Sequence, residues 1–174
     1  MKANPADYIF GPLGDQNLAA FSCSKRALEE YIKKYASQDV RRKLATVFVV
    51  SSKNKPKSVI GYYSLSNSST HLEQLPPDLI KKAGKYKILP VTLLGRMAID
   101  DAYRGQGIGE LVLMEALHQA LSVAHRVASF AVFTEAKDEE ASSFYQKYGF
   151  LRLPEDKLKL FIPMKTLEKL FSES

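Results

Sequence analysis

The chain has 174 residues, of which 45% are hydrophobic and 25% charged, a composition typical of one globular domain with its own core. No apolar run approaches the roughly 18 residues of a membrane helix, and the amino-terminal residues MKANPADYIFG lack the apolar segment of a signal peptide. One cysteine, Cys23, excludes an intramolecular disulfide and a cysteine-based metal cluster, so we expect a cytoplasmic protein without a metal. The formal net charge of +6 favours an anionic partner, with nucleic acid the leading class.

The first half of the chain predicts strands and one amphipathic helix. Residues 8–13 predict a short strand, and Ser24 is the expected N-cap of the helix. Apolar side chains then repeat with the helical period at Leu28, Tyr31, Ile32 and Tyr35. The β-branched and aromatic runs 45–50 and 59–65 predict two strands, and the polar residues 52–56 predict the hairpin turn between them.

The second half alternates helices and strands. Pro76 and Pro77 open a short helix, and the hydrophobic run 91–99 predicts a buried strand. A long helix follows it, with helical spacing at Leu113, Ala116, Leu117, Ala120, Leu121 and Ala124. Residues 127–134 predict another strand.

The last elements are a capped helix, a strand and a short terminal helix. Asp138 is the expected cap of a helix that presents Ala141, Phe144, Tyr145 and Tyr148 on one face, and Gly149 is the expected C′ residue. Residues 157–164 predict the last strand. The order of elements predicts a mixed α/β fold, and residues 1–174 read as a single domain.

A glycine-rich turn, Arg104-Gly105-Gln106-Gly107-Ile108-Gly109, joins the buried strand to the long helix. Glycines let a ligand approach the backbone, and N–H groups converge at a helix N-terminus, so the turn predicts a pyrophosphate site. A Walker loop is excluded, because no Gly-Lys-Ser/Thr tripeptide occurs. A dinucleotide fingerprint is disfavoured by the spacing of the glycines and by their place past the middle of the chain.

The pattern Arg-x-x-Gly-x-Gly after a strand resembles the acetyl-CoA loop of the GNAT N-acetyltransferases. The blocks GYYSLSNSST (61–70), PVTLLGRMAID (90–100) and SSFYQKYGF (142–150) resemble the GNAT toxins of type II toxin–antitoxin systems, which acetylate aminoacyl-tRNA. The opening FSCSKRALEEYI resembles their FxCGxxxLDxFL block, with Ser24 for glycine and Glu29 for aspartate. The similarity covers roughly residues 8–165 and implies the GNAT fold, a mixed central sheet flanked by helices.

The resemblance also implies the site. Acetyl-CoA is the expected co-substrate, held by Met97, Ala98, Ile99, Arg104, Gly105, Gln106, Gly107, Ile108 and Gly109, in the strand largely through main-chain atoms. Tyr145 matches the tyrosine of the FYxxxGF block and is the expected catalytic acid, because a phenol with a pKa near 10 can protonate a leaving thiolate. A purely structural role for Tyr145 on its apolar helix face is the alternative.

No general base is evident, and the proposed substrate explains why. An α-amino group has a pKa near 8, so a useful fraction is neutral at pH 7, whereas a lysine amine would call for a carboxylate base. Glu135 and Glu139 lie near the site in sequence and are candidates to act through water.

Basic residues form clusters that predict contacts with tRNA phosphates. The residues assigned to tRNA are Arg41, Arg42, Lys43, Lys81, Lys82, Lys85 and Arg96. Solvated helix faces are the alternative for any one cluster. Arg96 interrupts an apolar strand, so it either faces solvent or a phosphate, or forms an internal ion pair.

The sequence therefore favours a toxin that transfers an acetyl group to the α-amino group of aminoacyl-tRNA and so blocks translation. A ribbon-helix-helix antitoxin and a second copy of the chain are the expected protein partners, and no membrane is expected. The nearest alternative is a GNAT enzyme that acetylates a small amine or a protein N-terminus. A third possibility, a non-catalytic acyl-CoA-binding module, is disfavoured by Tyr145.

Overall fold

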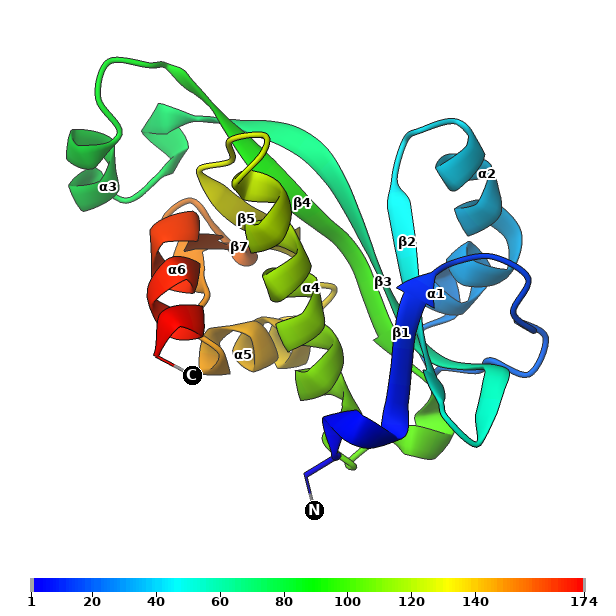
Figure 1. Cartoon of the computed structure of the whole chain (residues 1–174). Helices are drawn as coiled ribbons and strands as arrows, with labels where there is room; N and C mark the ends of the chain where they lie inside the picture. The colour runs from blue at the N-terminus through cyan, green and yellow to red at the C-terminus, as the bar shows by residue number, and fades with distance from the viewer. Residues whose placement is uncertain (1, 174) are drawn as a thin grey trace. The chain divides into compact units, whose positions relative to one another are not determined.

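The computed structural model describes residues 2–173, whose strands are hydrogen-bonded in the order β1-β2-β3-β4-β5-β7-β6 (Figure 1). The pair β4–β5 is parallel, while β1–β2, β2–β3, β5–β7 and β6–β7 are antiparallel. The mixed sheet predicted from the sequence is thus confirmed. The chain divides into two compact units, residues 2–66 with 95–116 and residues 67–94 with 117–173. Strands β3 and β4 and helix α4 contribute residues to both units.

The first unit contains the amino-terminal elements and the segment around the glycine turn. Its elements are η1 (Pro5–Asp7), β1 (Tyr8–Pro12), α1 (Arg26–Glu30), the π-helical turn η2 (Tyr31–Tyr35), α2 (Ala36–Arg41), β2 (Thr46–Ser52), η4 (Asp101–Tyr103) and parts of β3 (Lys55–His71), β4 (Ile88–Ile99) and α4 (Ile108–Ala124). Figure 1 shows α1 and α2 beside β2. The hairpin between β2 and β3 turns at Lys53 and Asn54, as predicted.

Two predictions about the first helix are wrong. The helix begins at Arg26 with Lys25 as its N-cap, so Ser24 is not the cap. Tyr35 is 50% exposed, although Tyr31 and Ile32 are buried. The π-helical turn is the reason, since its wider turn accommodates one more residue than an α-helical turn and rotates Tyr35 off the buried face.

The core of the first unit lies between the helices and the face of β2 and β3 that carries Tyr62. The Tyr62 ring packs edge-on against Phe21 at 5.8 Å and stacks on Tyr31 at 6.2 Å. Its hydroxyl donates to the backbone oxygen of Leu28 at 2.7 Å. Tyr62 therefore ties the sheet to α1 by packing and by a satisfied buried hydrogen bond. The neighbouring Tyr63 points to the other face, because side chains alternate along a strand.

The second unit contains η3 (Leu72–Gln74), α3 (Pro77–Lys82), β5 (Ala131–Glu135), α5 (Glu139–Lys147), β6 (Leu151–Leu153), β7 (Asp156–Pro163), α6 (Met164–Ser172) and the remaining parts of β3, β4 and α4. Residues Thr92–Leu94 of β4 pair with Val132–Thr134 of β5. Figure 1 shows α5 and α6 beside β7. Leu75, Leu89, Val91 and Phe161 contribute to a buried cluster in this unit.

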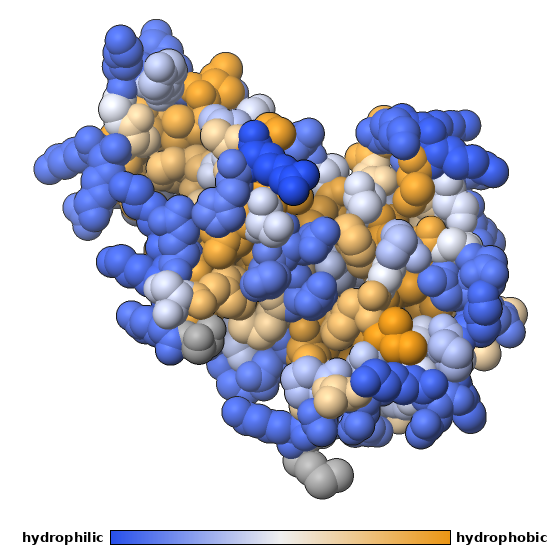
Figure 2. Space-filling view, viewed as in Figure 1, coloured by the Kyte–Doolittle hydropathy of each residue, from blue (hydrophilic) through white to orange (hydrophobic). Residues whose placement is uncertain are grey.

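Two strand predictions in the second unit need correction. Strand β5 starts at Ala131 rather than residue 127, because the N–H groups of Arg126 and Val127 turn back to the Val123 oxygen and Val127 is 64% exposed. Strand β6 was not predicted, since three residues are too few to display a period-two pattern. Among residues 2–173, no helix has both the length and the apolar character that crossing a membrane requires. Figure 2 shows hydrophilic residues gathered over α2 and α3.

Candidate active site

The segment that leads into the glycine turn is anchored by Asp100, a residue that the sequence analysis did not single out. Its side chain is 8% exposed and accepts hydrogen bonds from the backbone N–H of Ser22 at 3.0 Å and of Ala102 at 2.9 Å. The Asp100 N–H donates to the Ile60 oxygen at 2.9 Å. A buried carboxylate with such partners fixes the backbone directly before the turn. Its sequence signal was an aspartate that follows a strand and precedes a tight turn.

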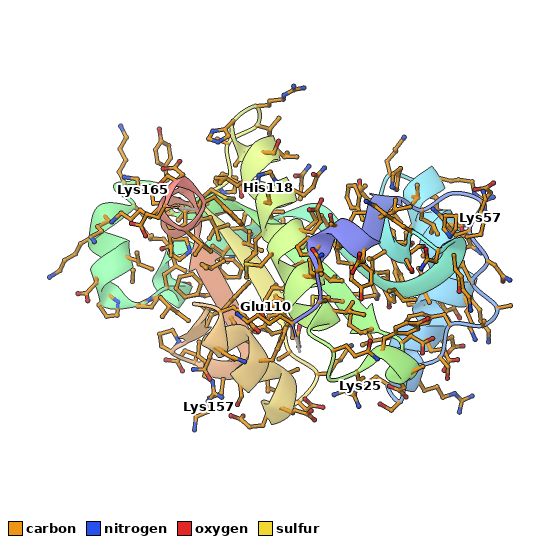
Figure 3. All side chains as sticks on the ribbon, turned by 60° about the horizontal axis from the view of Figure 1, so that its bottom comes forward. Lys25, Lys57, Glu110, His118, Lys157 and Lys165 are labelled. Atoms are coloured by element: carbon orange, nitrogen blue, oxygen red, sulfur yellow. The ribbon has the colours of Figure 1, made fainter. Side chains whose placement is uncertain are left out.

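Two glycines of the glycine turn adopt a backbone conformation that favours glycine. Gly105 and Gly107 have φ angles of +74° and +82°, a region that other residues rarely adopt. Helix α4 begins directly after Gly107, and Glu110 lies in its first turn (Figure 3). The first N–H groups of a helix have no acceptor within the helix, so this end of α4 offers donors to an anion.

The two glycines differ in what surrounds them. A Cβ on Gly105 would meet no heavy atom within 4 Å, so that side of the turn is open. A Cβ on Gly107 would lie 3.0 Å from the backbone nitrogen of Ala3 and 3.4 Å from the Cα of Lys2. We expected both glycines to make room for a ligand. At Gly107 the missing Cβ instead makes room for the amino-terminal segment of the chain.

The other predicted cofactor residues lie in the same unit as the turn. Arg104 is half-exposed and pairs with Asp101 at 3.7 Å, while Gln106 donates to the Ala102 oxygen at 3.4 Å. In β4, Ala98 is buried in the core, and Met97 and Ile99 on either side of it are half-buried. The Ala98 side chain therefore packs, which leaves only main-chain atoms there for a cofactor.

Tyr145 lies in the second unit, on α5, with 7% of its surface exposed. Its ring contacts Phe144 at 5.5 Å and Phe150 at 5.3 Å. Burial raises the pKa of the Tyr145 hydroxyl above its usual value of 10, and a hydrogen bond with the Thr134 side chain acts in the opposite direction. Thr134 itself donates to the Leu94 oxygen at 2.9 Å. The phenol is therefore protonated at neutral pH, as a proton donor must be.

A set of polar contacts holds the helix that carries Tyr145. Asp138 accepts from the Ala141 N–H at 2.8 Å, which confirms the predicted cap. Ser142 is fully buried, and its hydroxyl donates to the Lys157 oxygen at 3.0 Å and accepts from Arg152 at 3.2 Å. Arg152 also pairs with Glu139, so Glu139 is engaged in an ion pair. Ser142 and Arg152 were not predicted, because their contacts join segments that are apart in the sequence.

The predicted tRNA residues occur in both units. Arg41 ends α2, Arg42 is its C-cap and Lys43 follows with φ of 60°. Lys81 and Lys82 lie in the last turn of α3, and Lys85 follows that helix. Within residues 2–173, none of these six side chains forms an ion pair. The neighbouring lysines Lys33 and Lys34 differ, since each pairs with a glutamate one helical turn earlier.

Arg96 has an aromatic partner rather than an acidic one. It is exposed on β4, and its guanidinium carbon lies 3.8 Å from the centre of the Tyr31 ring. Across the part of the chain that the structure describes, Arg96 has no carboxylate partner, so the predicted alternative of an internal ion pair is wrong. The cation–π contact with Tyr31 holds the guanidinium at this exposed position of β4.

No group of three or more histidine, cysteine, aspartate or glutamate side chains in residues 2–173 is arranged to hold a metal ion. The site elements are thus backbone donors at the glycine turn in one unit, a buried protonated phenol in the other, and unpaired cations in each.

Comparison with known proteins identifies the family. The sequence pattern of the acetyltransferase (GNAT) domain matches residues 43–152, which is more than half of the chain. A curated relative, the tRNA-acetylating toxin of Mycobacterium tuberculosis, is 26% identical over 157 residues, 90% of this chain and 92% of that protein.

Two solved structures extend the similarity to the fold. AtaT complexed with acetyl-methionyl-tRNAfMet is 31% identical with a TM-score of 0.87, and the match covers 95% of this chain and 99% of that one. A tyrosine-to-phenylalanine mutant of the toxin AtaT, bound to the C-terminus of the antitoxin AtaR and acetyl-CoA, is 29% identical with a TM-score of 0.81, covering 95% and 98%. The chain belongs to the acetyltransferase (GNAT) domain family.

Proposed function

We propose that this protein is the toxin of a toxin–antitoxin pair and that it transfers the acetyl group of acetyl-CoA to the α-amino group of aminoacyl-tRNA. The similarity to AtaT complexed with acetyl-methionyl-tRNAfMet, over nearly the whole of both chains, is the observation that carries the proposal. The tRNA-acetylating toxin of Mycobacterium tuberculosis supports it at similar coverage. Acetylation removes the nucleophilicity of the amine, so the charged tRNA can no longer accept a growing peptide.

In this proposal the glycine turn holds acetyl-CoA, the co-substrate that supplies an activated acetyl thioester. The backbone N–H groups from Arg104 to Gly109 and the open side of Gly105 suit a pyrophosphate. Main-chain atoms of Met97, Ala98 and Ile99 contact the pantetheine arm of the cofactor. The acetyl-CoA bound to AtaT supports this assignment.

Tyr145 is the proposed general acid. Its phenol is buried and protonated, and its helix is held by Asp138, Ser142 and Arg152. The leaving thiol of coenzyme A has a pKa near 8.5, so a phenol can deliver a proton to it as the carbon–sulfur bond breaks. The attacking α-amine, with a pKa near 8, needs no strong base, which agrees with the engagement of Glu139 by Arg152.

The unpaired cations are the proposed tRNA contacts. Arg41, Arg42 and Lys43 form one group, Lys81, Lys82 and Lys85 form the second, and Arg96 is a single residue presented by Tyr31. Side chains without an acidic partner are free to neutralise phosphates and to release counterions.

The proposal extends to partners and location. AtaT binds the C-terminus of the antitoxin AtaR, and we infer an antitoxin of the ribbon-helix-helix class for this chain. We also infer a homodimer, a single functional domain over residues 1–174, and a cytoplasmic location, because charged tRNA is used there.

The decisive experiment incubates the purified protein with labelled acetyl-CoA and charged tRNA, and with free amino acids and peptides as competing acceptors. We expect N-acetyl-aminoacyl-tRNA as the dominant product. Expression in bacteria should arrest protein synthesis, and a peptidyl-tRNA hydrolase that clears the acetylated adduct should partly restore growth. Preferential acetylation of free amines or peptides, with normal growth at confirmed expression, would support the small-amine alternative instead.

Charge reversal tests the tRNA contacts separately. Changing Arg41, Arg42 and Lys43 to glutamate should weaken binding of every tRNA and make the dependence of log affinity on log salt shallower, with acetyl-CoA affinity unchanged. Changing Lys81, Lys82 and Lys85 to glutamate should have the same two effects on tRNA binding. A control reverses Lys165 and Lys169 on α6, which belong to neither cluster; Figure 3 labels Lys165 on that helix. Salt-independent binding, or full activity of both cluster variants, would contradict the assignment.

A further inference from the structure

The first unit contains a cleft of about 580 Å³ that is lined by none of the residues assigned above to the reaction. Its walls come from three segments: the start of β1, the β2–β3 hairpin and the end of η4. The side chains that give the cleft its chemistry are Asp7, Tyr8, Lys53, Lys55 and Tyr103. The cleft therefore combines two phenol rings and two ammonium groups on one surface.

The walls are held by backbone hydrogen bonds rather than by mobile side chains. Tyr8 of β1 pairs with Ser52 of β2 in the antiparallel ladder. The Lys53 N–H donates to the Asp7 backbone oxygen at 2.9 Å, which ties the β2–β3 hairpin to the residue before β1. Lys53 and Lys55 form no ion pair within residues 2–173, whereas Lys57, the next lysine of the hairpin, pairs with Asp15. Neither ammonium group thus has an ion-pair partner among the described residues, although Asp7 lines the same cleft.

Two of the walls lead directly to the glycine turn. Tyr103 precedes Arg104, and its N–H donates to the Asp100 oxygen at 2.9 Å, so it shares the anchored segment. Lys2 and Ala3, which contact the Cβ position of Gly107, precede Asp7 and Tyr8 in the chain by only a few residues. The glycine turn and the cleft are therefore built from the same short segments of the chain.

The chemistry of the cleft selects a phosphorylated nucleoside. Flat aromatic rings stack on a base, and ammonium groups bind a phosphate. Asp7 accepts hydrogen bonds and repels phosphate, so it suits an amino group of the base or a ribose hydroxyl. We propose that this cleft binds the 3′-phosphoadenosine end of acetyl-CoA, with Tyr8 and Tyr103 against the adenine and Lys53 and Lys55 on the 3′-phosphate. The inference rests on the proposed use of acetyl-CoA.

A nucleotide of the tRNA also carries a base and a phosphate, so it is the second ligand that this cleft could bind. The continuity of Tyr103 with the glycine turn favours the cofactor. The two sources are separable, because the 3′-phosphate can be removed from coenzyme A without touching the RNA.

The test measures the affinities of coenzyme A and 3′-dephospho-coenzyme A by calorimetric titration. The wild type should prefer coenzyme A by roughly tenfold or more, as charge-assisted contacts to a phosphate imply. The double variant Lys53→Ala, Lys55→Ala should lose most of this preference by binding coenzyme A more weakly, while its affinity for 3′-dephospho-coenzyme A stays unchanged. The double variant Tyr8→Leu, Tyr103→Leu should lower the affinity for coenzyme A and for 3′-dephospho-coenzyme A by the same factor.

Lys57→Ala is the matched control, because Lys57 lies on the same hairpin but pairs with Asp15 (Figure 3). It should leave the preference intact. A lysine double variant that keeps the full preference for coenzyme A would overturn the inference. If that variant binds coenzyme A normally and tRNA weakly, the cleft takes an RNA nucleotide and the cofactor assignment is wrong. A wild type that binds no coenzyme A at all would refute the proposed function and, with it, this inference.

Discussion

Lys43 provides a test in which fold stability and tRNA binding change in opposite directions. It follows α2 with φ of 60°, and in residues 2–173 it is the only residue other than glycine with a positive φ. Its N–H donates to the Val40 oxygen at 3.2 Å, and the Leu44 N–H donates to the Asp39 oxygen at 2.9 Å. These two bonds form a Schellman motif, whose left-handed position is usually glycine.

A lysine in this conformation is strained, because its Cβ approaches the following carbonyl oxygen, at about 1–2 kcal/mol. Glycine removes that strain, but about 0.4–1 kcal/mol is lost again because glycine has more freedom in the unfolded chain. We therefore expect Lys43→Gly to raise the free energy of unfolding by about 0.5–1 kcal/mol. For a chain of this size the melting temperature should rise by about 1–4 °C.

The same substitution removes a proposed phosphate contact. The tRNA affinity of Lys43→Gly should fall at low salt, and the slope of log affinity against log salt should become shallower by about 0.7–0.9. Lys43→Ala is the control, because it removes the charge and keeps the strain. It should bind tRNA as the glycine variant does, without the gain in stability.

Urea unfolding and fluorescence anisotropy with labelled tRNA measure the two effects. A glycine variant less stable than the wild type would refute the reasoning about backbone strain. Unchanged tRNA affinity in both variants would remove Lys43 from the proposed contacts.

Four other substitutions test the remaining assignments. Gly107→Val should abolish acetyl-CoA binding in calorimetric titration, since a valine strained at φ +82° and 3.0 Å from the Ala3 nitrogen distorts the turn whose N–H groups are proposed to hold the cofactor; near-normal affinity with unchanged circular dichroism would contradict this. Tyr145→Phe should slow single-turnover acetyl transfer by about 10²–10⁴-fold with acetyl-CoA affinity unchanged, and a loss below about threefold would make Tyr145 a packing residue. Tyr63→Phe should raise the free energy of unfolding by about 1 kcal/mol, because its buried hydroxyl has no hydrogen-bond partner within residues 2–173; a lower free energy of unfolding in urea titrations would contradict this. Burial raises the pKa of Tyr31 to about 12, so the stability that Tyr31 contributes is complete below pH 10 and is lost as the pH rises toward 12. Tyr31→Phe should reduce this alkaline loss in urea unfolding at pH 9 and pH 11.

Several features of the fold followed from the sequence because their physical causes are local. The positive φ angles at Gly105 and Gly107 depend on the absence of a Cβ, and the start of α5 depends on the Asp138 side chain three residues from its donor. The place of β4 before the turn follows from its apolar run. Resemblance to a known family added the assignment of the turn to acetyl-CoA, which no local pattern specifies.

Other features depended on contacts between segments distant in the chain. The π-helical turn exposed Tyr35, against the period that predicted its burial. Asp100 meets Ser22, and Arg152 meets Ser142, across separations that no periodicity encodes. Arg96 illustrates the same limit, because its sequence position left solvent, a phosphate contact and an internal ion pair as alternatives, and its contact with Tyr31 appeared only in the folded structure.

The amino-terminal segment shows most clearly what the tertiary structure alone decided. The sequence by itself determined that glycine occupies position 107 and that the turn joins a strand to a helix. Only folding brought Lys2 and Ala3 against that glycine and placed Tyr8, Lys53 and Tyr103 around one cleft. The reason is physical: backbone conformation is set by the residue and its near neighbours, whereas a site assembled from separate segments exists only once the packing of the core has brought them together.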